Sequence, residues 1–281
     1  MTGHTPNLGI LYADESGRGI THPFFVLILN AIKVEAARRG YDITFMHPAE
    51  DEDYAEHCRR GNIDGVCMVC VDFRAPRFKA LVESGIPCVT IDHIYRHTPA
   101  VLSDNETGVQ RLVEFAIKKG HRRIAFIYGH DNSIVTRTRI SQFHNTMAYH
   151  ELPVPPEYVR EGLYDNIGLT RRIVLELLQL PQRPTCIMLP DDVGYLGAQE
   201  AARELGLRIP ADISFGGYDG IPLTQAMTPR LTTIRQSSED IGQMAAKRLI
   251  DLIESPETAS RKANVFPVEL VEGGTIGPVL G

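Results

Sequence analysis

Short apolar segments alternate with longer amphipathic segments along most of the chain. Apolar runs bounded by glycine, proline or aspartate predict buried strands, and apolar residues spaced three and four positions apart predict helices. The clearest helix is expected at 105–119, where Val109, Leu112 and Ala116 share one stripe and Gly120 marks the end. We expect strands at 8–13, 42–46, 65–71, 87–91, 100–102, 123–128, 158–161, 185–189, 213–216, 231–234 and 265–271. We expect the other helices at 23–39, 51–60, 76–83, 137–150, 169–178, 193–205 and 237–254.

The order of these elements predicts an α/β fold. Repeated strand–helix–strand units are typical of parallel sheets that are covered by helices on both faces. Because the strand–helix alternation occurs in two successive sets, we expect two doubly wound parallel-sheet subdomains rather than one sheet. The segment from 231 onward does not continue this alternation, and we expect it to cross back between the two halves.

The composition is that of a globular protein, since 43% of the 281 residues are hydrophobic and 23% are charged. No apolar run approaches the roughly 20 residues that a membrane-crossing helix needs, so we expect no membrane partner. The formal net charge of −6 argues against DNA binding by this chain alone, because DNA-binding domains present a concentrated basic face. The basic cluster at 118–123 falls at an expected helix end, where cations complement the helix dipole.

Five cysteines, an odd number, argue against a complete disulfide framework and favour a reducing cytoplasm. Cys67 and Cys70 have the spacing of a zinc or redox motif. They lie, however, in an apolar run that predicts a buried strand, and no second pair offers further ligands. We therefore expect no metal site and no cofactor.

Polar side chains follow most of the expected strands. In open α/β sheets, ligands bind beyond the carboxyl ends of the strands, so these positions are candidates for a binding site. They are Asp14, Asp92-His93, Ser103-Asp104-Asn105, His130-Asp131-Asn132, Asp165-Asn166, Asp191-Asp192 and Tyr218-Asp219. One interpretation is that about half of them are helix N-caps, a position that aspartate fills well. The other is a polar cleft rich in hydrogen-bond acceptors.

An acceptor-rich cleft suits a neutral ligand with many hydroxyl groups, such as a sugar or polyol, because buried hydroxyls need partners. The obvious cations are Arg137 and Arg139, whose forked donors can clamp vicinal hydroxyls or a carboxylate. Aromatic surface from Phe24, Phe25 or Phe143 could cover the apolar face of a sugar ring. Core packing is the alternative for Phe25 and Phe143.

Sequence signatures of catalysis are missing. The chain has no Gly-x-Ser-x-Gly elbow, no His-Glu-x-x-His and no phosphate loop that ends in Gly-Lys-Ser/Thr. The spacing of histidines and carboxylates assigns no nucleophile and base, so we expect no catalytic residues and no enzyme.

Seven segments carry a family likeness through their order and spacing. They are His22-Pro-Phe-Phe25, Ala36-Ala-Arg-Arg-Gly-Tyr41, Ser103-Asp-Asn-Glu-Thr-Gly108, Gly120-His-Arg-Arg-Ile-Ala-Phe-Ile127, Ile209-Pro-Ala-Asp-Ile-Ser214, and the pair Gly217-Tyr-Asp-Gly220 with Leu231-Thr-Thr-Ile-Arg-Gln236. Over nearly its whole length the chain resembles the effector-binding core of LacI/GalR transcription regulators. The resemblance implies the type I periplasmic-binding-protein-like fold, with three crossovers between the subdomains.

The resemblance also implies how the chain is divided and what it binds. One subdomain would comprise residues 1–120 with 238–263, and the other 121–237 with 264–281. A homodimer is implied, which agrees with the apolar start of the first helix at 24–29. Operator DNA would be bound through a helix-turn-helix head ahead of Asn7, and we expect that head to be absent from this chain.

Effector contacts carried over by the resemblance fall on residues of both predicted subdomains. Arg139 would clamp the ligand, Asp219 would accept hydrogen bonds from its hydroxyls, and Gln236 would close the Thr-Thr-Ile-Arg-Gln segment at the hinge. The full set is His22, Phe24, Arg139, Asp191, Asp219 and Gln236, with Asp14, Asp92 and Asp165 as further candidates. His22 stands where the family often has Asn, and Pro190-Asp-Asp192 replaces the usual Asn-Asp, which puts the particular effector in doubt.

Two other functions remain open at this point. A sugar-binding component of an ABC-type uptake system shares the two-lobed fold, but it would be a monomer, exported, and usually without the Leu-Thr-Thr-Ile-Arg-Gln segment. An α/β enzyme that acts on a sugar would need a base and a nucleophile that the sequence does not indicate.

Overall fold

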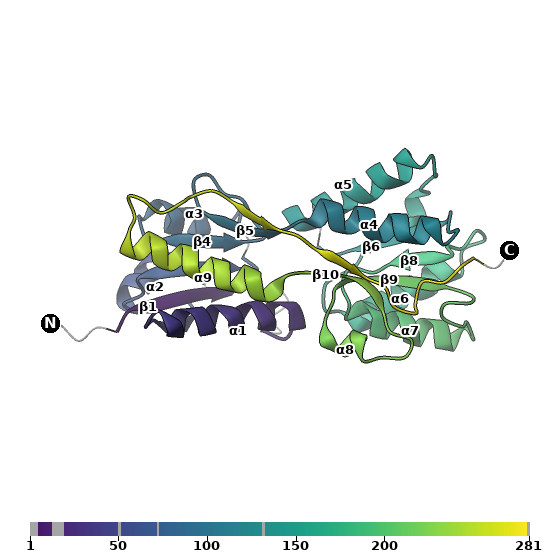
Figure 1. Cartoon of the computed structure of the whole chain (residues 1–281), viewed down its shortest axis with the longest axis horizontal. Helices are drawn as coiled ribbons and strands as arrows, with labels where there is room; N and C mark the ends of the chain where they lie inside the picture. Colours follow the sequence, from purple (N-terminus) through teal and green to yellow (C-terminus); the bar gives the residue numbers. More distant parts are fainter. Residues whose placement is uncertain (1–4, 13–19, 50–51, 72, 131–132, 280–281) are drawn as a thin grey trace. The chain divides into compact units, whose positions relative to one another are not determined.

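The computed structural model describes residues 5–12, 20–49, 52–71, 73–130 and 133–279. The chain divides into two compact units, Met1–Ser103 with Ser237–Phe266, and Asp104–Gln236 with Pro267–Gly281 (Figure 1). The backbone therefore passes from one unit to the other three times.

The first unit is built on a six-stranded sheet in the order β11-β5-β4-β3-β1-β2, in which every pairing is parallel. Its strands are β1 (Asn7–Tyr12), β2 (Asp42–Met46), β3 (Gly65–Val69), β4 (Cys88–Ile91), β5 (Ala100–Ser103) and β11 (Asn264–Phe266). Its helices are α1 (Pro23–Arg38), α2 (Tyr54–Arg60), α3 (Pro76–Glu83) and α9 (Ser238–Glu254). Helices α1 and α9 pack on one face of the sheet, and α2 and α3 pack on the other.

The second unit has a sheet in the order β12-β10-β9-β8-β6-β7, parallel except for the antiparallel pairing of β12 with β10. Its strands are β6 (Ile124–Tyr128), β7 (Val159–Glu161), β8 (Cys186–Met188), β9 (Ser214–Asp219), β10 (Thr232–Arg235) and β12 (Glu269–Val271). Its helices are α4 (Asn105–Lys118), α5 (Ile134–Tyr149), α6 (Ile167–Leu178), α7 (Gly194–Glu204), the short α8 (Pro222–Gln225) and a 3₁₀ turn at Pro156–Tyr158. Helices α4 and α5 pack on one face, and α6 and α7 on the other, so both units are doubly wound as predicted.

Strand β3 shows how the apolar pattern builds both faces of a sheet. Cys67 and Val69 enter the core beneath α1 and α9, whereas Val66 and Met68 enter the core beneath α2 and α3. All four are completely buried, and burial raises the pKa of the Cys67 thiol to about 12. The raised pKa keeps this thiol neutral, as in a core residue, so the buried-strand interpretation is confirmed for Cys67. Cys70 follows the end of β3 and is partly buried.

Helix α1 lies very close to α9 because the contact includes a glycine. A Cβ atom built at Gly242 of α9 would lie 2.3 Å from the carbonyl oxygen of Ile28 on α1. Any larger residue would therefore push the helices apart.

The unit boundaries differ from the predicted ones at α4. Val109, Leu112 and Val113 of this helix pack with Phe126 and Phe143 of the second unit. The helix therefore belongs to the second unit, although the predicted boundary at 120 placed it in the first.

The last predicted strand, 265–271, is in fact two strands separated by Pro267. Strand β11 pairs with β5 in the first unit, and β12 pairs with β10 in the second. Because proline has no backbone N–H, the strand ladder breaks there and the chain changes sheets.

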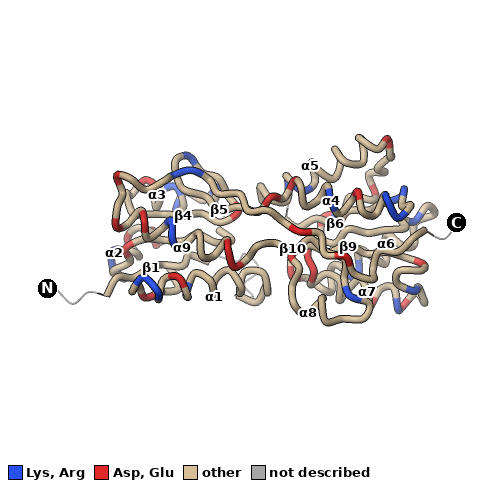
Figure 2. The backbone as a smooth tube through the Cα atoms, in the orientation of Figure 1, with Lys and Arg blue, Asp and Glu red and all other residues tan. Residues whose placement is uncertain are grey.

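Charged residues are spread over both units, with Lys and Arg interspersed among Asp and Glu (Figure 2). Within the described ranges, no helix is both long and apolar enough to cross a membrane.

Candidate functional site

The predicted polar residues of the second unit gather at one edge of its sheet. Tyr164 and Asp165 follow β7, Pro190 and Asp191 follow β8, Asp219 ends β9, and Gln236 follows β10. Because these strands are parallel, their carboxyl ends meet at one edge. Arg139 joins the group from α5, the helix that follows β6.

Arg139 is 6% exposed and is held on several sides. Its Nε donates to Asn105 Oδ1 at 2.7 Å, and its Nη1 donates to the carbonyl oxygen of Pro190 at 3.4 Å. The guanidinium carbon lies 3.6 Å from the ring centroid of Tyr218, a cation–π contact that fixes the plane of the fork. The side chain is therefore oriented before any ligand arrives, which lowers the entropy cost of binding.

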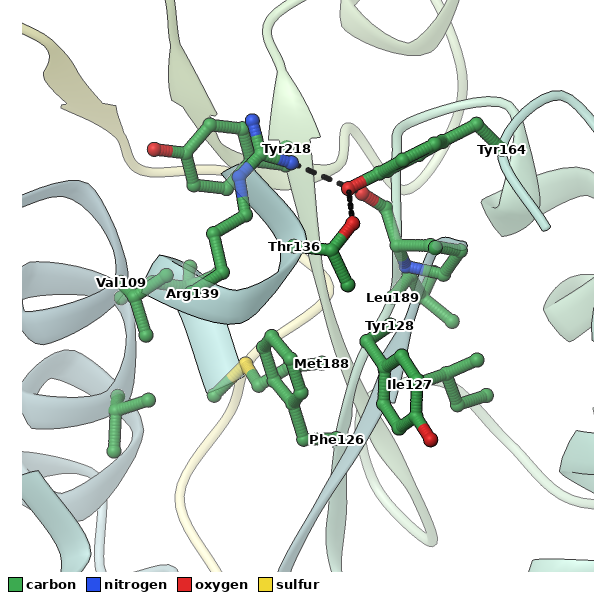
Figure 3. A pocket seen from close by; sticks show the side chains of 14 residues that line it. Val109, Phe126, Ile127, Tyr128, Thr136, Arg139, Tyr164, Met188, Leu189 and Tyr218 are labelled. Atoms are coloured by element: carbon green, nitrogen blue, oxygen red, sulfur yellow. Dashed lines mark hydrogen bonds between the residues drawn. The ribbon is translucent and has the colours of Figure 1, made fainter. Parts of the chain in front are cut away.

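Figure 3 shows the surroundings of this arginine. The Thr136 hydroxyl lies 2.8 Å from the hydroxyl of Tyr164, whose ring centroid is 6.0 Å from the guanidinium carbon. Beneath lies a small cavity of about 10 Å³, lined mainly by apolar side chains such as Val109 and Met188. It has room for about one water molecule, so it is a packing space behind the arginine and not a ligand pocket.

Asp219 and Gln236 form a second part of the group. Gln236 Nε2 donates to Asp219 Oδ1 at 2.7 Å, and the Gln236 backbone N–H donates to the Asp219 carbonyl at 3.2 Å. Asp219 has a φ of 112°, a strained conformation for a residue other than glycine, and such strain concentrates at functional sites. The Oε1 atom of Gln236 is buried and has no hydrogen-bond partner among the described residues.

Asp191 accepts hydrogen bonds from two backbone N–H groups near it. Its Oδ1 accepts a hydrogen bond from the Gly194 N–H at 2.7 Å, and its Oδ2 accepts one from the Asp165 N–H at 2.5 Å. Both oxygens thus order the segments that follow β8 and β7, although the N-cap residue of α7 is Val193 and not Asp191. A direct contact of Asp191 or Asp165 with a ligand stays a prediction.

Asp192, which the sequence pattern placed beside Asp191 among the polar candidates after a strand, is completely buried. It accepts hydrogen bonds from the Thr233 hydroxyl at 2.5 Å, and from the Ile221 N–H and the Thr224 hydroxyl, each at 2.9 Å. Burial, and secondarily the charge of Asp219, raises the pKa of this carboxyl to about 8. Desolvation outweighs the three hydrogen bonds, each of which favours the ionised form.

Four predicted residues belong to the first unit, and three of them are described. His22 caps α1, since its Nδ1 accepts from the Phe24 N–H at 3.3 Å, and its ring packs edge-on against Phe25. Phe24 itself is only 4% exposed and packs with Ile28 in the core. Asp92 has a φ of 56°, and its Oδ1 accepts from the Ser103 N–H at 3.4 Å. Asp14 lies outside the described residues.

Both other aromatic candidates pack with a core, Phe143 within it and Phe25 against its border. Phe143 is completely buried and stacks on Phe126 at 4.9 Å, whereas Phe25 is half-buried and packs against Tyr12. The sequence pattern did not predict the contact between Arg139 and the ring of Tyr218. The position of Tyr218, directly before Asp219 at a strand end, was the feature that could have indicated it.

Comparisons with known proteins agree with this geometry. The sequence profile of the periplasmic binding protein-like domain family matches residues 113–276. The HTH-type transcriptional repressor ExuR of Bacillus subtilis (strain 168) is 29% identical over 256 residues, which cover 90% of this chain and 76% of the relative. The HTH-type transcriptional repressor PurR of Pectobacterium carotovorum subsp. carotovorum (strain PC1) is 28% identical over 288 residues, which cover 99% of this chain and 82% of the relative.

Solved structures share the whole fold. A transcriptional regulator LacI from Bacillus cereus subsp. cytotoxis NVH 391-98 has a TM-score of 0.89 at 26% identity, covering 97% of this chain and 98% of that one. A LacI family transcriptional regulator from Enterococcus faecium, solved with bound ribose, has a TM-score of 0.84 at 24% identity, covering 98% of this chain and 100% of that one.

Proposed function

We propose that this chain, which belongs to the periplasmic binding protein-like domain family and is a core of the LacI/GalR regulator type, binds a small polar effector. Binding of the effector would change the affinity of the regulator for its operator DNA. The observation that carries the proposal is the group at the carboxyl edge of the second unit. A buried arginine, a strained aspartate and a glutamine with an unpartnered buried oxygen stand together there.

The chemistry of this group favours a sugar or polyol. Arg139 offers forked donors, Asp219 offers acceptors, and Gln236 offers one buried oxygen that a ligand hydroxyl would satisfy. One arginine beside several carboxylates suits a neutral ligand better than an anion. The relative from Enterococcus faecium, whose bound molecule is ribose, supports the same class.

We propose that one ligand is bound by residues of both units. His22 would contribute from the first unit, and Phe24 would support His22 from the core. Binding would favour one relative arrangement of the units, and allosteric couplings of this kind are typically about 1–3 kcal/mol, or about 5- to 150-fold in affinity. Operator contact would be made by a helix-turn-helix head of the kind in the relatives' names, since this chain carries a net charge of −6.

We also propose a homodimer in the cytoplasm. Apolar side chains are exposed on adjacent parts of the first unit: Val26 (44%) and Val34 (61%) on α1, and Phe45 (54%) on the edge strand β2. Exposed apolar groups on neighbouring elements are typical of surfaces that a partner covers.

Val34→Glu is expected to shift the chain from dimer to monomer, because it places a charge within this apolar surface. Sedimentation velocity over a concentration series measures the change. Val265→Glu is the matched control, since Val265 is 59% exposed in the same unit but lies on β11 at the other edge of the sheet. A Val34→Glu variant that stays dimeric, or a monomeric wild type, contradicts the proposed surface.

A thermal-shift screen against monosaccharides, disaccharides and polyols tests the effector class. A ligand that binds only the folded state stabilises it by about 2.7 kcal/mol at a hundredfold excess over its Kd. We expect a saturable upward shift with one sugar or polyol class. Shifts only with nucleosides, amino acids or phosphorylated metabolites would contradict the neutral-sugar proposal and leave the regulator proposal standing.

A further inference from the structure

A second cavity lies in the first unit, at the edge of the sheet opposite His22 and Asp92. It is bounded by the α3–β4 connection, by the β4–β5 connection and by the segment that follows α9. These segments lead into the amino ends of β4 and β5, whereas Asp92 follows the carboxyl end of β4. The cavity has a volume of about 320 Å³, which is within the range of small-molecule sites.

The rim of this cavity carries a surplus of positive charge. Arg96, His97 and Arg261 line it together with a single carboxylate, that of Glu83. Arg96 Nη1 pairs with Glu83 Oε1 at 2.9 Å, so two arginines against one glutamate leave one net positive charge among the lining residues. Arg96 keeps this position with a φ of 46°, a backbone conformation that glycine or asparagine adopts more readily.

Thr98 supplies a polar group inside the cavity. The residue is only 7% exposed and lines the cavity. A hydroxyl that lines a cavity beside two arginines can donate to an anionic oxygen. The remaining wall is apolar and includes Ile86, Pro87 and Leu252.

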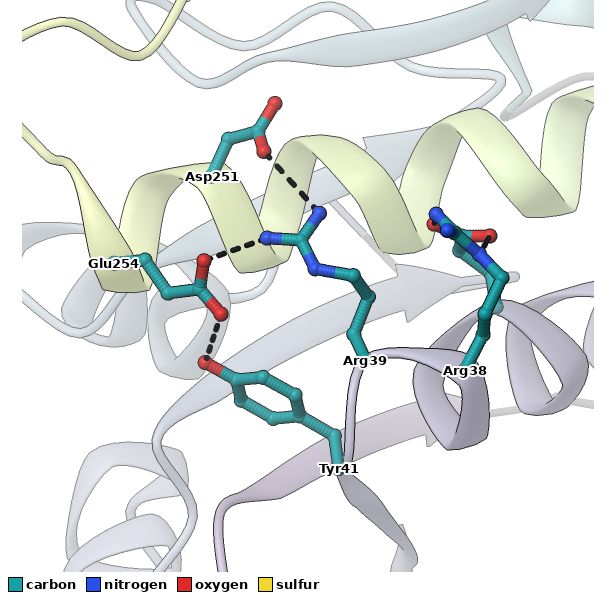
Figure 4. A network of polar contacts seen from close by, with 6 residues as sticks. Arg38, Arg39, Tyr41, Asp251 and Glu254 are labelled. Atoms are coloured by element: carbon teal, nitrogen blue, oxygen red, sulfur yellow. Dashed lines mark hydrogen bonds and ion pairs between the residues drawn. The ribbon is translucent and has the colours of Figure 1, made fainter.

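The α9 side of the cavity is held in place by ion pairs (Figure 4). Arg39 pairs with Glu254 at 2.6 Å and with Asp251 at 3.8 Å, and the Tyr41 hydroxyl donates to Glu254 at 3.4 Å. These contacts fix the last turn of α9, which contributes Leu252 to the cavity. Because Arg39 pairs with both Asp251 and Glu254, the negative charges of these two acids repel an incoming anion less.

We propose that this cavity binds the phosphate group of a small phosphorylated metabolite. Arg261 and Arg96 contact the phosphate oxygens, His97 and Thr98 donate further hydrogen bonds, and the organic part lies against the apolar wall. Arginine forks match phosphate geometry, and an anion with three terminal oxygens uses all of these donors. The site is separate from the proposed effector group and does not depend on it.

Calorimetric titration of the whole chain with glycerol 3-phosphate and ribose 5-phosphate tests this site. We expect saturable binding of at least one of them at physiological salt, with none by glycerol or ribose at this site. Arg261→Gln should weaken binding by about tenfold or more, because a charge-assisted contact is lost. Thr98→Val, which keeps the shape of the side chain, should weaken it several-fold.

Lys262→Gln is the matched control, since it removes the same charge from the next residue, which does not line the cavity. It should change the affinity by less than about twofold, as expected for a screened surface charge. Equal losses in Arg261→Gln and Lys262→Gln, loss only in Arg139→Gln, binding of glutarate in place of the phosphate esters, or no saturable binding at millimolar ligand would each overturn the proposal.

Discussion

Replacing Arg139 by alanine is expected to weaken effector binding by about a hundredfold or more. Its donors are already oriented by Asn105 and by the ring of Tyr218, so a ligand gains their hydrogen bonds with little ordering cost. A hydrogen bond to a charged group contributes about 1.5–3 kcal/mol, and each 1.4 kcal/mol is a factor of ten in Kd. Calorimetric titration with the sugar found by thermal shift measures the loss.

Two further variants distinguish the loss of a direct ligand contact from a general disturbance of the fold. Arg137→Ala removes the same charge from an exposed position on the same helix, and it should bind normally. Arg139→Lys keeps the charge but loses the planar fork, so it should bind nearly as poorly as the alanine variant. Normal affinity in Arg139→Ala, with the fold intact by circular dichroism, would remove Arg139 from the proposed site.

The hydrophobic pattern predicted the elements well, because burial on both sides of a parallel strand leaves a compact apolar run. It could not assign α4 to a unit, since one apolar stripe fits either sheet. Only the packing of α4 against Phe126 and Phe143 shows that it belongs to the second unit. The pattern also merged β11 and β12 into one strand, although Pro267 marks the break between them.

The candidate site was predictable to the extent that topology determines it. Strand order places Asp191, Asp219 and Gln236 at one edge whatever their side chains do. What each carboxylate contacts was not predictable, because neighbouring aspartates look alike in a sequence. Both are buried, but Asp191 accepts hydrogen bonds from the backbone N–H groups of Gly194 and Asp165, whereas Asp192 contacts the side chains of Thr224 and Thr233.

Asp192 should be protonated in the folded protein at neutral pH. Its pKa is raised to about 8, first by burial and then by the charge of Asp219. The contacts agree, because the single hydroxyl proton of Thr224 lies within reach of both Asp192 Oδ2 at 2.9 Å and the Ile221 carbonyl at 3.1 Å. A protonated Asp192 can donate to Thr224 Oγ1 while Thr224 donates to Ile221, and both groups are then satisfied.

Protonation of Asp192 makes the stability of the fold depend on pH in a defined direction. The folded pKa lies above the unfolded value of about 3.9, so the folded state binds the proton more tightly. The contribution of this group is therefore complete below about pH 4 and is lost as the pH rises toward 8. Relative to Asp192→Asn, which cannot ionise, the wild-type free energy of unfolding should fall with rising pH by up to about 1.4 kcal/mol per unit in this window.

Urea unfolding of both proteins between about pH 5 and about pH 7 measures the slope of this difference. Asp212→Asn is the control, because the hydrogen bond and charge of Arg208 lower the pKa of Asp212 to about 2. Its contribution is lost only on acidification, so its difference from wild type should stay constant over the same interval. A constant difference for Asp192→Asn as well would mean that the carboxyl is already ionised in the folded state, and that the three hydrogen bonds to it outweigh its burial.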